Sequence, residues 1–236
     1  MSLLEVRGAM VRFGGVMAVG GVDLDVQAGQ VTGLIGPNGA GKTTLFNVIS
    51  GIQEPTAGTI RVNGIDVTHE PPHRRAKRGL ARTFQRLELF GSMTVRDNVR
   101  VAAELAALTN VDETVDDLLE KVGVSDLAET TAGDLPTGSA RLVEIARALA
   151  TCPRLLLLDE PASGLDEAES DRLGTLLHEL TADGLGVLLV EHDMSLVMHV
   201  CDSIFVLDLG HIIAHGTPSE IQHDAKVLHA YLGAPS

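Results

Sequence analysis

The segment Gly36–Thr44, GPNGAGKTT, has residue types and spacing suited to binding phosphate groups. It contains the full pattern G-x-x-x-x-G-K-[ST]. The glycines let the backbone wrap closely round phosphates, and successive N–H groups and the following helix N-terminus favour negative charge. In this pattern Lys42 reaches the terminal phosphates and the Thr43 hydroxyl coordinates Mg²⁺. The pattern predicts a site for a nucleoside triphosphate with Mg²⁺, formed by Gly36, Pro37, Asn38, Gly39, Ala40, Gly41, Lys42, Thr43 and Thr44.

Two carboxylates follow the apolar run Leu155–Leu158 and supply groups that such a site needs. The leucines predict a strand buried on both faces, with Asp159 and Glu160 at its carboxyl end. Asp159 is placed to hold Mg²⁺, directly or through water, and Glu160 to act as general base or to orient water at the γ-phosphate. Acidic residues after a strand often form only a solvated turn. A complete phosphate-binding pattern in the same chain favours the catalytic interpretation.

His192 and Gln85 are two further polar residues at predicted strand ends. His192 follows the apolar run 186–190, which we expect to be parallel to the strand that ends at Asp159. We therefore expect His192 to contact the γ-phosphate and to polarise the attacking water. Gln85 ends a short predicted strand before a helical segment. We expect Gln85 to sense Mg²⁺ or water, although a glutamine there, taken alone, is more simply a surface amide.

Several other clusters of polar residues have simpler explanations. The segment 69–73, HEPPH, matches the zinc pattern H-E-x-x-H, but that pattern needs a helix, which its two prolines prevent. We expect Arg74–Arg78 to be the solvated face of a short helix rather than a site for anionic headgroups or RNA. Cys152 and Cys201 lack metal-ligand spacing, and we expect both to be reduced and packed as small hydrophobic residues. The histidines expected at the surface are His211, His215, His223 and His229.

The composition indicates an acidic globular protein. The 236 residues include 18 basic and 32 acidic side chains, a formal net charge of −14. This charge repels phosphate backbones and argues against nucleic acid as the main partner. No apolar run is long enough to span a membrane, and the N-terminus lacks the basic and apolar regions of a signal peptide. We therefore expect a cytoplasmic protein that acts at a membrane only by docking onto other chains.

Short apolar runs alternate with helical patterns along most of the chain, which predicts an α/β fold with a mostly parallel core sheet. Helices are expected at 42–50, at 139–150 and from Asp166 onward. The first sixty residues instead suggest an N-terminal antiparallel β lobe, and the region after Thr94 suggests an inserted α-helical lobe. We expect a single domain over 1–236, with residues 1–93 and 151–236 as catalytic core and β lobe, and residues 94–150 as helical lobe ending in the helix after GDLPTGSAR.

In their order along the chain, these motifs resemble those of an ABC-type ATPase subunit, and the resemblance covers essentially the whole sequence. It implies the P-loop NTPase fold, ATP and Mg²⁺ as cofactors, and ATP hydrolysis coupled to membrane transport. Phe13 would stack on adenine, Gln85 would link the nucleotide to the membrane partner, and His192 would be the switch histidine. Thr43, Gln85 and Asp159 would surround the metal. A loop crossing the dimer interface would consist of Ser163, Gly164, Leu165 and Asp166.

The resemblance also implies partners. Two ATPase subunits, identical or different, would pair head to tail, so that each ATP lies between the phosphate-binding segment of one subunit and the signature loop, residues 135–139, of the other. Transmembrane permease subunits would bind the surface around Gln85 and residues 86–98. The chain would then be a peripheral protein on the inner face of the cell membrane.

The segments RGLARTFQRLELFGSMTVRDNV and HGTPSEIQHDAKVLHAYLG are similar to the subfamily that energises uptake of branched-chain and other hydrophobic amino acids. Relatives drive import of urea or amides, and a similar ATPase serves lipopolysaccharide export. The predicted helical lobe is short for the amino-acid subfamily, which leaves these cargoes open. Two further alternatives are a soluble ABC protein of translation or DNA repair, which usually has two ATPase units or a long coiled coil, and a slow regulatory nucleotide binder.

The segment GDLPTGSAR departs from the family's signature pattern, Leu-Ser-x-Gly-Gln. Leu135 and Gly138 match it, whereas Pro136 replaces the serine and Ser139 the glutamine. Pro136 removes one hydroxyl and one N–H group, although Thr137 and Ser139 offer substitute hydroxyls and the helix dipole remains. In a head-to-tail pair this change weakens the partner's ATP site. We therefore predict an asymmetric heterodimer with one strong hydrolytic site, or a slow homodimer.

Overall fold

The computed structural model describes residues 2–232. Its larger sheet has the strand order β10-β9-β3-β8-β7-β6. Neighbouring strands are parallel from β9 to β6, and β10 is antiparallel to β9. All residues of β3, β7 and β8 are buried, which explains their uninterrupted apolar sequences. The predicted mostly parallel core sheet is confirmed. Its strands are β3 (Val31–Ile35), β6 (Leu80–Arg82), β7 (Leu155–Asp159), β8 (Gly186–Val190), β9 (Ser203–Asp208) and β10 (His211–Gly216).

Helices cover both faces of this sheet. Along β7, Leu156 and Leu158 belong to the apolar cluster that includes the helices α5, α6 and α7, whereas Leu155 and Leu157 belong to the cluster that includes α1. This division follows from the alternation of side chains along a strand. The sheet therefore lies between two helical layers, whose helices are α1 (Lys42–Ser50), α5 (Thr137–Leu149), α6 (Glu167–Ala182) and α7 (Met194–Val200), with α8 (Pro218–Gln222) and α9 (Ala225–Leu232) beside β10.

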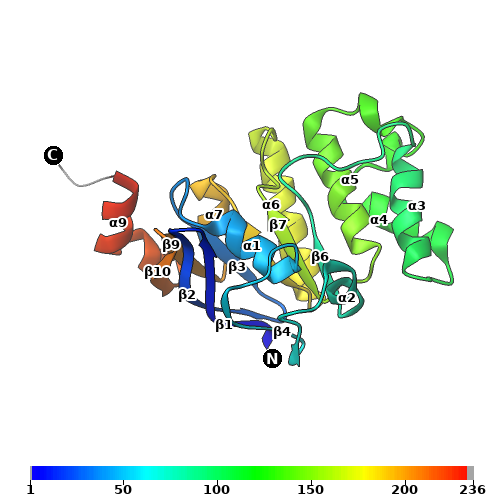
Figure 1. The fold of residues 1–236 in the computed structure, drawn as a ribbon. Helices are drawn as coiled ribbons and strands as arrows, with labels where there is room; N and C mark the ends of the chain where they lie inside the picture. Colours follow the sequence, from blue (N-terminus) through cyan, green and yellow to red (C-terminus); the bar gives the residue numbers. More distant parts are fainter. Residues whose placement is uncertain (1, 233–236) are drawn as a thin grey trace.

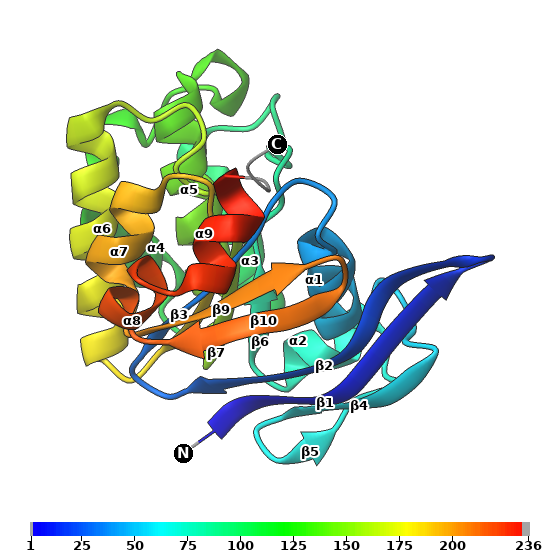
Figure 2. The same cartoon turned by 90° about the vertical axis from the view of Figure 1, so that its left-hand side faces the viewer.

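A smaller antiparallel sheet has the order β2-β1-β4-β5 and packs against α1. Its long β1–β2 hairpin extends well beyond the rest of the sheet (Figure 2). The sequence predicted this N-terminal antiparallel β lobe, and the structure confirms it. The strands are β1 (Ser2–Phe13), β2 (Val16–Gln27), β4 (Ala57–Val62) and β5 (Ile65–Asp66).

Between Thr94 and Ala150 the chain forms helices, which lie beyond the β6 edge of the larger sheet (Figure 1). Thr94 is the N-cap of helix α3, and its side chain accepts a hydrogen bond from the N–H group of Asp97. The helices pack on one another through Val99, Val115 and Val143. The division of the chain into a core and an inserted lobe stays a prediction. The helices are α3 (Val95–Leu105), α4 (Val111–Lys121) and α5, with 3₁₀ turns at Ser125–Leu127 and Ala132–Asp134.

The expectation of a fully solvated basic helix at Arg74–Arg78 is wrong for Arg75. Helix α2 (Pro72–Lys77) begins after Pro71, so His69 precedes it. The Arg75 side chain is buried and donates hydrogen bonds to four backbone carbonyls, including those of Val48 and Ile49 in the last turn of α1. The reason is that carbonyls at a helix C-terminus lack partners within the helix, and a guanidinium can satisfy several of them.

The other surface predictions have mixed outcomes. Both cysteines are free, but only Cys201 is buried; Cys152 is exposed, in a turn with φ 50°, so the prediction that it packs in the core is wrong. His211, His215, His223 and His229 are exposed, as predicted. Within residues 2–232, no helix is both long and apolar enough to cross a membrane.

Candidate active site

The phosphate-binding segment is a tight loop between β3 and α1, and two of its glycines have no room for a side chain. A Cβ atom on Gly36 would lie 1.9 Å from the carbonyl oxygen of Leu207, and one on Gly41 would lie 2.4 Å from that of Ala18. Gly41 also has φ 108°, a conformation that favours glycine. The glycine spacing found in the sequence is therefore a requirement of both backbone conformation and packing.

Lys42 is the first residue of α1, and its side chain is buried inside the loop. Its Nζ donates hydrogen bonds to the carbonyl oxygens of Gly36 at 2.6 Å and Pro37 at 3.0 Å. Burial lowers the pKa of Lys42, and the nearby carboxylates Glu160 and Asp159 oppose this shift. Gly41, at the N-cap, offers no side chain to α1. The loop thus combines a buried ammonium with a helix N-terminus whose N–H groups can bind an anion.

These groups line a cavity of about 290 Å³. Residues from distant parts of the chain meet there, because the carboxyl ends of β3, β6, β7 and β8 lie at the same edge of the parallel sheet. The structure therefore brings Gln85, Glu160 and His192 to the phosphate-binding loop. The cavity is lined by Ala18, Asn38, Gly39, Ala40, Gly41, Lys42, Thr43, Thr44, Gln85, Glu160 and His192.

Glu160 is held between the other two side chains. Its Oε1 atom lies 2.9 Å from Nε2 of His192, and its Oε2 atom accepts a hydrogen bond from Nε2 of Gln85, also at 2.9 Å. Glu160 has φ 53°, which is rare for a residue with a side chain, and its N–H group donates to the carbonyl of Val190 at 2.9 Å. Such backbone strain persists only where neighbouring groups hold it, and it is frequent at active sites.

Asp159, one residue earlier, does not line this cavity. Its Oδ2 atom accepts a hydrogen bond from Arg82 at 3.0 Å, and both side chains are almost completely buried. Burial raises the pKa of Asp159, and the Arg82 guanidinium opposes the shift. Sequence reasoning missed Arg82. One feature of the sequence could have indicated it: Arg82 is a basic residue within a short apolar strand, β6, which pairs with β7.

Glu191 is a second buried residue that sequence reasoning missed. One of its carboxylate oxygens accepts a hydrogen bond from the Ala162 N–H group at 2.7 Å, and the other accepts from that of His192 at 2.9 Å. Burial raises the pKa of Glu191, while these N–H groups act in the opposite direction. Glu191 therefore ties the loop after β7 to the loop that carries His192. Its position directly before the predicted site residue His192 could have indicated it from the sequence.

The remaining predicted site residues lie outside the cavity. Phe13 is at the tip of the β1–β2 hairpin and is 52% exposed. Pro136 is the N-cap of α5 and makes no side-chain capping bond. Gly138 is buried against Glu169 of α6, and Thr137 lies against Gly164. The structure thus places the start of α5 beside the segment Ser163–Asp166, and neither lines the cavity that contains Lys42. Ser163 nevertheless donates its N–H group to the carbonyl of Glu160 at 3.2 Å. Leu135 and Leu165 are partly buried, Ser139 lies in the first turn of α5, and Asp166 is the N-cap of α6.

Sequence comparison identifies the family. The family model described as "ABC transporter" matches residues 19–163, which include the phosphate-binding loop, Gln85 and Glu160. The chain belongs to the ABC transporter family. It is an ATP-binding subunit that hydrolyses ATP. A second model, described as "Branched-chain amino acid ATP-binding cassette transporter", matches residues 211–235. ATPase cassettes of this family work as dimers with transmembrane permease partners.

Individual relatives agree with this assignment. The ATPase subunit is 43% identical, over 98% of both chains, to the high-affinity branched-chain amino acid transport ATP-binding protein BraF of Pseudomonas aeruginosa. It is 36% identical to the lipopolysaccharide export system ATP-binding protein LptB of Escherichia coli (strain K12), over 99% of this chain and 98% of LptB. The fold matches the crystal structure of the ADP conformation of MJ1267, an ATP-binding cassette of an ABC transporter, with a TM-score of 0.89, 32% identity and 99% coverage of both chains.

Proposed function

We propose that this ATPase subunit energises the uptake of branched-chain or other hydrophobic amino acids. The observation that carries the proposal is the match of residues 211–235 to a model specific to branched-chain amino acid cassettes. This segment lies outside the loops predicted to bind ATP. Its similarity therefore reflects the type of transporter rather than the ATP hydrolysis that is common to the family. The 43% identity to BraF supports the same cargo.

A transport assay tests this cargo. The subunit would be purified from native membranes with its permease and ATPase partners and reconstituted in vesicles with labelled leucine outside and ATP on the cytoplasmic side. We expect ATP-dependent leucine uptake that is lost in the Glu160→Gln complex. The similarity to LptB makes lipopolysaccharide export the second candidate. ATP-dependent release of lipopolysaccharide without leucine uptake would replace the first proposal by the second.

The loop and the N-terminus of α1 would bind the ATP phosphates. Lys42 would exchange its bonds to the carbonyls of Gly36 and Pro37 for bonds to phosphate oxygens. Thr43 and Gln85 line the cavity and offer hydroxyl and amide oxygens that fit a hard cation such as Mg²⁺, whereas Asp159, outside the cavity and bonded to Arg82, would hold the ion through water. When bound, Mg²⁺ would neutralise charge on the phosphates.

Glu160 would act as the general base for hydrolysis. Its carboxylate faces the cavity, where one oxygen is 2.9 Å from His192 and the other 2.9 Å from Gln85. A water bound between Glu160 and the γ-phosphate would lose its proton to the carboxylate as it attacks. His192 and Gln85 would hold the carboxylate and that water in line with the phosphorus atom. Phe13 would stack on adenine when the hairpin lies over the nucleotide.

A second ABC ATPase subunit would complete the site. The signature loop lies at the N-terminus of α5, apart from the cavity that contains Lys42 in the same chain. A head-to-tail pair would bring the partner's signature loop and the partner's loop equivalent to Ser163–Asp166 over this cavity. The N–H groups at the start of a helix would then face the γ-phosphate from the partner's side. The partner would be a second copy or a different ATPase.

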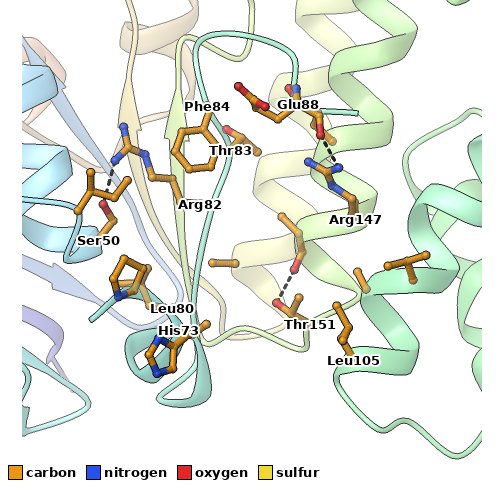
Figure 3. Close-up of a pocket in the computed structure, with 18 of the residues that line it drawn as sticks. Ser50, His73, Leu80, Arg82, Thr83, Phe84, Glu88, Leu105, Arg147 and Thr151 are labelled. Atoms are coloured by element: carbon orange, nitrogen blue, oxygen red, sulfur yellow. Dashed lines mark hydrogen bonds between the residues drawn. The ribbon is translucent and has the colours of Figure 1, made fainter. Parts of the chain in front are cut away.

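The permease would bind a second cavity, of about 620 Å³, between β6, α2, α3 and α5 (Figure 3). Phe84, Phe90 and Leu105 line it and are more than a third exposed, whereas Glu88 and Arg147 provide charge. An exposed apolar surface with a few charged groups suits a short amphipathic segment of another protein. This arrangement would place the subunit on the inner face of the cell membrane as a peripheral protein.

A further inference from the structure

Two guanidinium bonds join α5 to the loop that carries Gln85. The Nη1 atom of Arg141 donates a hydrogen bond to the carbonyl oxygen of Phe84 at 2.7 Å, and its Nη2 atom donates to that of Gln85. The loop between Arg82 and Val95 forms neither helix nor strand. The backbone position of Gln85 therefore depends on contacts such as these, made by side chains from another element.

Two neighbouring side chains of α5 hold the same loop farther on. Glu144 accepts a hydrogen bond from the N–H group of Glu88 at 2.7 Å, and Arg147 donates to the carbonyl of Glu88 at 2.6 Å. Arg141 also donates to Glu144 at 3.1 Å. Residues three apart are neighbours on a helix surface, so Arg141, Glu144 and Arg147 form one continuous row along α5.

The first two members of this row are buried. The side chains of Arg141 and Glu144 are 7% and 3% exposed. Burial raises the pKa of Glu144, and the N–H group of Glu88 and the Arg141 guanidinium oppose the shift. A buried ion pair adds little net stability, because removing two charges from water offsets their attraction. The Arg141–Glu144 pair therefore matters here because it fixes the geometry of the loop between Arg82 and Val95.

The held loop reaches the catalytic carboxylate directly. Gln85 Nε2 donates to Glu160 Oε2 at 2.9 Å, and the backbone carbonyl of Gln85 is bound by Arg141. A shift of about 1 Å in a positioning group can lower a rate by about 100-fold. Two hydrogen bonds therefore link Arg141 to Glu160, with Gln85 as the residue between them.

We propose that Arg141 is a positioning residue for ATP hydrolysis, which acts by holding the Gln85 backbone so that the Gln85 side chain orients Glu160. Glu144 fixes Arg141 and binds the same loop at Glu88. The proposal rests on the proposed function of Gln85 and Glu160. It also links α5, whose N-terminus carries the signature loop, to the catalytic carboxylate of the same subunit.

The first test is steady-state ATP hydrolysis by the Arg141→Ala subunit. We expect kcat to fall by about 10- to 100-fold, with the KM for ATP changed by less than about twofold, because Arg141 does not touch the nucleotide loop. Arg141→Lys, which keeps the positive charge on a single donor nitrogen, should recover part of the loss. The matched control is Arg100→Ala, since Arg100 pairs with Asp112 inside the helical region. We expect this control to keep wild-type kcat.

A double-mutant cycle then separates positioning through Gln85 from other effects. Gln85→Ala alone should lower kcat, and adding Arg141→Ala should lower it by less than about a further twofold. If the two losses multiply, Arg141 does not act through Gln85 and the inference is overturned. If Gln85→Ala leaves kcat unchanged, the proposed role of Gln85 fails instead.

A third variant excludes a purely structural role. Arg141→Ala leaves the Glu144 carboxylate buried without its cation, so its thermal unfolding temperature should fall. The pair Arg141→Met with Glu144→Gln removes both charges and should recover that temperature. We expect kcat of this pair to stay low. Recovery of kcat together with the unfolding temperature would show that Arg141 serves stability alone, and the inference would be wrong.

Discussion

Glu160 is the residue on which the contacts of the active site converge. His192 from the end of β8 and Gln85 from the loop after β6 bind its two carboxylate oxygens. Its positive φ of 53° is maintained by the N–H bond to Val190. A non-glycine residue in this region costs about 1–3 kcal/mol. We infer that the strain is tolerated because it aims the carboxylate at the phosphate-binding loop.

The Glu160→Gln subunit should lose hydrolysis but keep ATP binding. An amide cannot accept a proton from water, and we expect kcat to fall by at least about 100-fold. ATP should then accumulate in a stable dimer. Phosphate release measures the first effect, and size-exclusion chromatography with ATP the second. Glu179→Gln, an exposed glutamate of α6, is the matched control. Wild-type turnover in Glu160→Gln would overturn the assignment of the base.

Glu191 should give the native state a specific pH dependence. Burial raises its pKa, so between the ordinary value of about 4.3 and the raised value the native state binds more protons than the unfolded state. The contribution of Glu191 to the unfolding free energy is therefore present at low pH and is lost as pH rises through this window.

Urea unfolding from about pH 4 to pH 7 measures this effect. The Glu191→Gln subunit should gain unfolding free energy relative to wild type as pH rises, because the variant has no carboxyl to ionise at this position. Glu120→Gln, which removes an exposed carboxyl on α4, is the matched control. A constant difference for Glu191→Gln would contradict the prediction.

At the scale of elements, the short helix α2 acts as an anchor for the end of α1. The Arg75 guanidinium binds the carbonyls of Val48 and Ile49 on α1, and those of Thr68 and Glu70 ahead of α2. Helix α1 carries Lys42 and Thr43 at its other end. The phosphate-binding loop is therefore attached to a helix whose opposite end is held by Arg75.

Arg75→Ala should strongly destabilise the subunit. The substitution removes a buried donor from four carbonyls, of which that of Val48 keeps the N–H group of Gly51, and each buried carbonyl left unpaired costs about 1–3 kcal/mol. We expect the unfolding free energy in urea to fall by about 3 kcal/mol or more. The neighbouring Arg74 is exposed, and Arg74→Ala should stay within about 0.5 kcal/mol of wild type. Equal effects of the two substitutions would contradict the anchor.

At the scale of the whole molecule, the residues predicted to bind ATP lie partly in a cavity and partly outside it. The cavity contains Lys42 and Glu160, whereas the start of α5 lies outside it, beside the segment Ser163–Asp166. We propose that pairing with a second ATPase subunit brings these two parts together. The unusual Pro136 leaves α5 without a side-chain cap, so its effect is expected on the partner's ATP.

Pro136→Ser should raise ATP hydrolysis by the subunit paired with itself. A serine restores one N–H group and one hydroxyl at the start of α5. A hydrogen bond worth about 1 kcal/mol corresponds to roughly a fivefold increase in kcat. The control is Pro218→Ser, because α8 already has a complete capping box. Unchanged activity in Pro136→Ser would mean that Thr137 and Ser139 compensate for the proline.

The sequence by itself determined the parts of this protein that depend on short-range patterns. The glycine spacing at Gly36–Thr44 predicted a tight loop, because backbone conformation and close packing exclude a side chain at Gly36 and Gly41. Uninterrupted apolar runs predicted the buried strands. Their parallel order then predicted that Glu160 and His192 meet at one sheet edge.

Only the tertiary structure decided which charged residues are buried and what they bind. Arg75, Arg82, Arg141 and Glu191 look like surface residues in the sequence, yet each has partners that are distant in the chain or that belong to the backbone. A backbone carbonyl or N–H group is present at every position, so no residue type marks it as a partner. Long-range packing alone determines which of these groups lie within reach of a buried charge.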